Sequence, residues 1–184
     1  GTVHRAVTKY MVNVALDREV PKHISGAEQK LSGSEISKEL LQTLRASGEA
    51  LAARGGQTIE LTARDGTRLV GHWFEQEHAD RVIVAMHGWR SCWCNDFGIV
   101  ADFWFDNGCS VLFAEQRGQG ESGGAYMGFG LLERHDCLEW VNWVNEQTGE
   151  ALPVYLCGVS MGASTVMMAA GLELPKNVRG IIAD

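Results

Sequence analysis

Several features that mark other classes of protein are missing from this sequence. No uninterrupted apolar stretch reaches the ~18 residues that a membrane-spanning helix needs. Lysine and arginine together number 16 against 23 aspartates and glutamates, which gives a formal net charge of -7. Nucleic acids and anionic membranes bind clustered positive charge. The sequence therefore predicts no membrane span in this segment and no nucleic-acid partner.

Cysteine is also scarce, and its spacing matches no disulfide framework. The five cysteines are Cys92, Cys94, Cys109, Cys137 and Cys157. We expect this odd set to be reduced, which favours a cytoplasmic location. Cys92-Trp93-Cys94 lacks a second pair of ligands nearby, so we expect no metal site. Because the chain begins with Gly1, an N-terminal leader or anchor removed upstream stays an open alternative.

The most informative motif is Cys157-Gly158-Val159-Ser160-Met161-Gly162. It follows the apolar run Pro153–Leu156 and precedes a helix-forming run from Ala163 to Leu172. A strand, a tight turn and a helix in this order form a nucleophile elbow, which lifts the serine hydroxyl clear of the sheet. The pattern predicts that Ser160 is a nucleophile, and the alternative is a serine that only caps the following helix.

A second segment is expected to meet the same site. The run Arg81–Met86 is apolar on both faces, as in a central parallel strand, and it ends in His87-Gly88-Trp89-Arg90. A tetrahedral oxyanion needs two N–H donors about 3 Å away. The backbone N–H groups of Trp89 and Met161 are our candidates for this oxyanion hole. Trp93, in the loop that follows, is a candidate for the acyl pocket, against the alternative of a core residue.

A third segment, Val111–Ala114, leads into a glycine-rich loop that reads Glu115-Gln116-Arg117-Gly118-Gln119-Gly120-Glu121-Ser122. This loop lacks the lysine of a P-loop, and no Rossmann helix opens directly behind it. We therefore expect no nucleotide and no other cofactor.

Together these three segments resemble the α/β-hydrolase superfamily over about residues 58–184. The resemblance is to bacterial serine hydrolases related to the prolyl-oligopeptidase-like, serine-aminopeptidase-like and feruloyl-esterase-like branches. In that family the His-Gly-x segment supplies oxyanion donors, and an Asp-x-Arg-Gly-x-Gly-x-Ser loop follows the next strand. Here Glu115 replaces the usual aspartate and Gln119 the frequent histidine. Because of these departures, the motif does not assign the chain to one subfamily. The prediction for Ser160 is unchanged.

The remaining pattern predicts the fold class. Strands 58–61 and 68–74 flank the turn Asp65-Gly66, as in an antiparallel hairpin. Strands and helices then alternate: helices near 96–106 and 131–146 separate the later strands, and the last strand covers 179–183. Such alternation predicts an α/β fold with a mostly parallel sheet and helices on both faces, incomplete at its C-terminal side.

Two helices are expected to precede this core. Residues 2–19 place apolar side chains three and four apart, and a capping box at Ser32 and Glu35 opens a second helix that ends near Arg54. We therefore divide the chain into an N-terminal helical extension, 1–57, and a hydrolase-like part, 58–184. The extension either packs beside the core or covers the substrate entrance.

One residue type is missing where the chemistry needs it. A serine nucleophile requires a histidine base that a carboxylate orients, and in this fold the chain order is serine, acid, histidine. All six histidines precede Ser160, and His87 and His135 are weak candidates for the base. Asp184, just past the last expected strand, is a candidate for the acid.

The prediction is the N-terminal part of a serine hydrolase that cleaves an ester, amide or related acyl bond through an acyl-enzyme. Its substrate would be a small-molecule or peptide acyl compound. A missing C-terminal segment or a second chain would complete the sheet and supply the base, and the 184-residue chain alone would be inactive. The alternatives are a non-catalytic binding protein with this fold and one chain of a split hydrolase.

Overall fold

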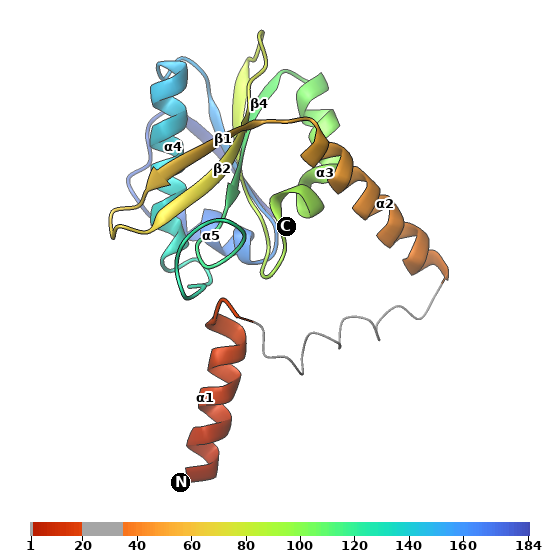
Figure 1. Cartoon of the computed structure of the whole chain (residues 1–184). Coiled ribbons are helices and arrows are strands. Elements are labelled where there is room, and N and C mark those ends of the chain that lie inside the picture. Colours follow the sequence, from red (N-terminus) through yellow and green to blue (C-terminus); the bar gives the residue numbers. More distant parts are fainter. Residues whose placement is uncertain (1, 20–34) are drawn as a thin grey trace.

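The computed structural model describes residues 2–19 and 35–184, and a six-stranded sheet lies at its centre (Figure 1). From one edge to the other the strands are β1 (Gln57–Thr62), β2 (Arg68–Phe74), β4 (Cys109–Glu115), β3 (Arg81–Met86), β5 (Val154–Gly158) and β6 (Val178–Ala183). β1, β2 and β4 pair antiparallel, whereas β4, β3, β5 and β6 are parallel. The expected α/β fold is confirmed.

Helices cover both faces of the sheet. On one face, α4 (Glu133–Thr148) and α5 (Met161–Ala169) bury Trp140, Val144 and Val166 against the sheet. On the other face, α3 (Trp93–Asp106) buries Phe97 and Trp104. β4 is buried along its whole length, because both faces of this strand are covered. Phe97 and Trp104 are therefore part of the core.

The two N-terminal helices occupy different places (Figure 1). α2 (Glu35–Ala53) packs closely on α3, since a side chain at Gly98 would meet the backbone of Ser47 and Gly48. α1 (Thr2–Leu16) projects away from the sheet, and within the described ranges its C-terminal end forms hydrogen bonds with the core. The proposed capping box begins at Ser32, which lies outside the described residues.

Element boundaries differ slightly from expectation. α3 begins at Trp93 rather than near Asp96, and α5 ends at Ala169 rather than Leu172. The hairpin turn forms as predicted, with Ala63 N–H donating to Thr67 O over 2.8 Å. Among the described residues, no helix is both long and apolar enough to cross a membrane.

Candidate active site

Ser160 lies at the turn between β5 and α5, and its backbone has φ 54° and ψ -112°. A non-glycine residue with such a φ is strained, and strain of this kind persists only where the surroundings hold it. Three hydrogen bonds do so here: Ser160 N–H donates to Asp184 O, Gly162 N–H to Val159 O, and Val159 N–H to Met86 O. The residue is exposed, so the turn presents its hydroxyl to solvent.

The two glycines of the motif permit close packing around this turn. A side chain at Gly162 would collide with the carbonyl of Met86 on β3, and one at Gly158 would collide with the backbone of Gly162. Only residues without a Cβ allow β5, the turn and α5 to come this near to β3. The sequence pattern therefore reflects a steric requirement of the turn.

The segment after β3 approaches the serine. An added Cβ at Gly88 would lie 3.4 Å from the Cβ of Ser160. The carboxylate of Asp96, in the first turn of α3, accepts the Gly88 N–H over 2.6 Å and the Ser91 hydroxyl over 2.5 Å. Asp96 thus holds both ends of the turn 88–91, which we call the oxyanion turn.

The N–H groups of Trp89 and Met161 have no hydrogen-bond acceptor within the part of the chain that the structure describes. Met161 follows Ser160 directly, and Trp89 follows Gly88, where an added Cβ would lie 3.4 Å from Ser160 Cβ. Unpaired donors near a serine suit the binding of an oxyanion. The structure thus brings Ser160, Trp89 and Met161 to the same end of the parallel strands.

His87 is held in a structural position. Its Nδ1 is 2.8 Å from Gly88 O, and its Nε2 accepts the N–H of Gln116 over 3.1 Å. Both ring nitrogens are therefore occupied, and the ring is the neutral Nδ1–H tautomer. Burial lowers the pKa of His87 and favours the same neutral form. This ring cannot take the proton of Ser160.

The other histidines with described contacts also interact with residues other than Ser160. His72 Nε2 lies 2.8 Å from the Glu115 carboxylate, and its ring stacks on Trp93 at 4.3 Å. His135 lies beside Arg134, and partial burial together with nearby arginines lowers its pKa. Among the described residues none donates to or accepts from the Ser160 hydroxyl. Asp184 meets Ser160 through its backbone carbonyl.

The glycine-rich loop is fastened by buried charges. Arg117 donates through Nε and Nη2 to both carboxylate oxygens of Asp136 over 2.6 Å, and through Nη1 to Asp65 over 2.7 Å. Glu115, in place of the family's aspartate, accepts the Glu121 N–H and contacts His72. Burial alone would raise the pKa of Glu115, but these two hydrogen bonds lower it overall. The carboxylate therefore stays ionised and shapes the loop.

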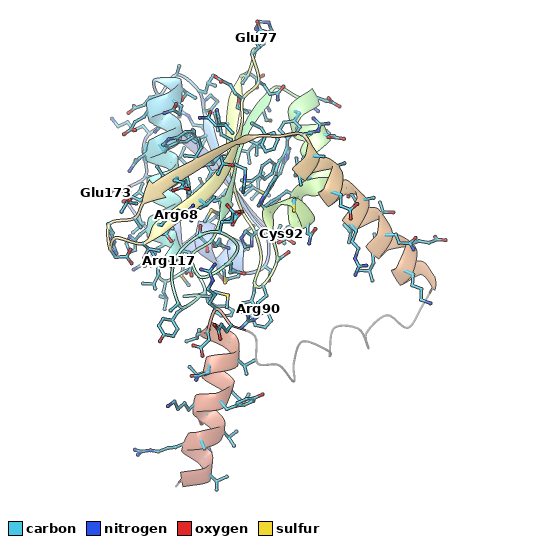
Figure 2. All side chains as sticks on the ribbon, viewed as in Figure 1. Arg68, Glu77, Arg90, Cys92, Arg117 and Glu173 are labelled. Atoms are coloured by element: carbon cyan, nitrogen blue, oxygen red, sulfur yellow. The ribbon has the colours of Figure 1, made fainter. Side chains whose placement is uncertain are left out.

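The C-terminal end of α1 rests on the oxyanion turn. The Trp89 indole donates to Ala15 O over 2.9 Å, and the Arg90 guanidinium donates to Val14 O and Asp17 O. Figure 2 shows Arg90 at this junction between α1 and the core. Arg90 itself has φ 51°, a second strained residue within the site.

Packing explains the surroundings of residues 92–94. The hypothesis that Trp93 lines an acyl pocket is wrong, because the residue is the buried first residue of α3 and contacts Phe74 and Phe113. The sulfur atoms of Cys92 and Cys94 lie 3.0 Å apart, and burial raises the pKa of Cys94 to about 12. Its thiol is therefore protonated at neutral pH.

Asp96 and Gln119 are contributors that the sequence motifs do not reveal. Gln119 Oε1 accepts the Arg90 N–H over 2.5 Å and so links the glycine-rich loop to the oxyanion turn. The only sequence signal for Asp96 is an acidic residue in the first turn of a helix that follows a His-Gly turn. The only sequence signal for Gln119 is that it replaces the histidine that is frequent at this position in the family.

Comparison with known proteins agrees with this geometry. The family model of the serine aminopeptidases S33, a hydrolase family, matches residues 77–183, and the chain belongs to this family. An esterase from Pyrococcus furiosus, Pf2001, is similar in structure, with a TM-score of 0.62, 28% sequence identity, and coverage of 71% of this chain and 51% of that chain. The fold is that of the α/β-hydrolase superfamily.

Two further relatives extend the comparison. An esterase from Exiguobacterium antarcticum shares the fold, with a TM-score of 0.54, 23% identity, and coverage of 69% of this chain and 44% of that chain. The uncharacterized protein YqkD of Bacillus subtilis is 27% identical over 119 residues, which are 65% of this chain and 39% of that protein. The chain thus spans about half or less of the length of these relatives.

Proposed function

We propose that this chain carries the nucleophile and the oxyanion hole of a serine hydrolase that cleaves an ester, amide or related acyl bond. Ser160 attacks the acyl carbon and forms an acyl-enzyme, while the N–H groups of Trp89 and Met161 stabilise the oxyanion. Water then releases the acid. The observation that carries the proposal is the exposed, strained Ser160, with unpaired N–H donors at the next residue, Met161, and at Trp89, the residue after Gly88.

The base of this reaction is proposed to come from outside the 184 residues. His87 has both ring nitrogens occupied, and His72 is paired with Glu115. β6 is the last strand of the sheet, and its Ile182 side chain is 49% exposed. A further segment of the protein, or a second chain, would pair with this edge and supply the histidine. Asp184 is the proposed acid.

The substrate class is an acyl compound of small-molecule or peptide type. The esterase neighbours favour an ester, and the aminopeptidase family model favours an amide. Five free cysteines favour a reducing compartment such as the cytoplasm. A non-catalytic binding protein is the alternative, because no described histidine contacts Ser160.

The test is labelling with a fluorophosphonate probe, which reacts with activated serines. We expect the full-length protein to be labelled on the peptide that contains Ser160 and the Ser160→Ala variant to lose the label. Ser164→Ala, one turn further along α5, is the matched control and should keep it. Labelling that persists in Ser160→Ala contradicts the assignment, and absence of labelling in the wild-type protein supports the binding protein.

A further inference from the structure

A pocket of about 250 Å³ lies beside the oxyanion turn, where the glycine-rich loop meets the segment after α1. Its walls come from three parts of the chain that are distant in sequence. The lining residues are Arg18, Arg90, Ser91, Gly118, Gln119, Gly120 and Met127. Nothing in the hydrolytic mechanism above uses this pocket.

Gln119 lines the pocket and carries an unused hydrogen-bond donor that is itself out of contact with solvent. The residue is 6% exposed, and its Oε1 accepts the Arg90 N–H, which fixes the orientation of the amide. Its Nε2 is fully buried and has no partner in the described ranges 2–19 and 35–184. A buried donor without an acceptor is costly, and native proteins normally provide one. An acceptor in the pocket would complete this amide.

Two arginines make the surroundings of this donor positive. Arg18 donates only to backbone carbonyls of the glycine-rich loop, at Gly120, Ser122 and Gly124. Arg90 likewise donates to the carbonyls of Val14, Asp17 and Arg18. Neither guanidinium forms an ion pair with a described carboxylate, so both positive charges remain.

The carboxylates nearest in sequence do not enter the pocket. Asp17 and Glu19 flank Arg18, but they line a neighbouring groove with Tyr126. Two arginines and Gln119 line the pocket, and no described acidic residue does; the carboxylates of Asp96 and Glu115 lie behind it, against Ser91 and Gly120. This set of groups suits a monoanion that accepts hydrogen bonds, such as a carboxylate.

We propose that this pocket binds a carboxylate of the substrate, so that the enzyme prefers anionic acyl compounds. Arg90 and Ser91 line the pocket and belong to the same turn as Gly88, where an added Cβ would lie 3.4 Å from Ser160 Cβ, so the proposal places one substrate across the nucleophile and the pocket. Arg18 and Arg90 attract the carboxylate, and the Gln119 side chain turns its Nε2–H toward it. This inference rests on the proposed function, because it names the substrate of the same serine.

The experiment compares matched esters with the full-length protein. One pair carries the charge on the acyl side, mono-p-nitrophenyl adipate against p-nitrophenyl hexanoate. The other carries it on the leaving group, 4-acetoxybenzoate against its methyl ester. In one pair we expect kcat/KM to favour the anion about tenfold or more, as a hydrogen bond to a charged group allows.

Three variants test the residues. Gln119→Glu should reverse the preference by repulsion, and Gln119→Met and Arg90→Gln should bring the ratio toward one. Arg45→Gln, an equal charge change on exposed α2, should leave the ratio as it is. Absence of a preference in both pairs, or a ratio that Gln119→Glu does not change, overturns the proposal.

A binding measurement separates this proposal from the function of the serine. Calorimetric titration of the full-length Ser160→Ala protein should show that benzoate binds and benzamide does not, and that Gln119→Glu abolishes benzoate binding. If no ester is hydrolysed but benzoate binds in this way, the hydrolase proposal fails and the carboxylate site stands. If esters are hydrolysed without preference and benzoate does not bind, the carboxylate site alone fails.

Discussion

At the scale of single residues, the backbone and the side chains of the oxyanion turn have different roles. Gly88 has no room for a bulky side chain, because a Cβ on this residue would lie 3.2 Å from Asp96 Oδ2 and 3.4 Å from Ser160 Cβ. Trp89 is proposed to act through its N–H, while its indole reaches Ala15 on α1. Substitutions at these two neighbours should therefore have different effects.

We expect Gly88→Val to lower kcat by on the order of 10²-fold, the loss typical when one oxyanion donor is displaced. Trp89→Phe keeps the backbone donor and should retain much of the activity. The measurement is ester hydrolysis by the full-length protein, with circular dichroism to check that both variants fold. Small and equal effects of the two substitutions would show that the turn is remote from the chemistry.

At this scale the sequence predicts the turn that carries Ser160 well and the contacts that support this turn poorly. Ser160 is recognisable because its turn needs Gly158 and Gly162 at fixed spacing. Asp96 and Gln119 act through contacts between loops, and such contacts leave no periodic pattern in the sequence. The sequence also places Trp93 in a loop, because the start of α3 has no side-chain cap at Cys92 to mark it.

At the scale of elements, the glycine-rich loop depends on one buried charge cluster. The side chains of Arg117 and Asp136 are 6% and 2% exposed and join the loop to α4. Removal of one partner leaves the other charge buried without compensation. The loop in turn positions Gln119 against the oxyanion turn.

Arg117→Met should therefore lower the free energy of unfolding by about 3–5 kcal/mol, the range for broken buried ion pairs. Arg81→Met is the matched control, because its partner Asp80 is exposed, and it should change stability little. Urea unfolding of the full-length variants measures both. Equal and small losses would show that the Arg117 cluster is not needed to hold the loop.

The order of strands and helices in the core is predictable from the sequence because each element has its own apolar pattern. β3 and β4 are apolar on both faces, and the structure buries both faces. The placement of α1 and α2 could not be predicted in the same way. Their positions depend on a Gly48–Gly98 contact and on backbone carbonyls at residues 14–17, and neither is encoded by helical periodicity.

At the scale of the whole molecule, the decisive question is whether the 184 residues act alone. We expect this chain to hydrolyse a p-nitrophenyl ester far more slowly than the full-length protein, because triad enzymes without their base keep only a small part of their rate. The native downstream segment, added in cis or in trans, should restore turnover. Full activity of a verified 184-residue monomer would instead assign the base to a histidine upstream of Ser160.

Because the end of α1 rests on the oxyanion turn, the position of this helix is energetically coupled to the proposed reaction centre. The carbonyls of Val14, Ala15 and Asp17 accept from Arg90 and Trp89, whose backbone also forms the turn. Linkage is reciprocal: if the turn binds the proposed oxyanion, any event on α1 that alters these contacts changes that affinity, and occupancy of the turn changes α1 by the same free energy. The described contacts at the end of α1 thus couple the helix to the affinity of the proposed site.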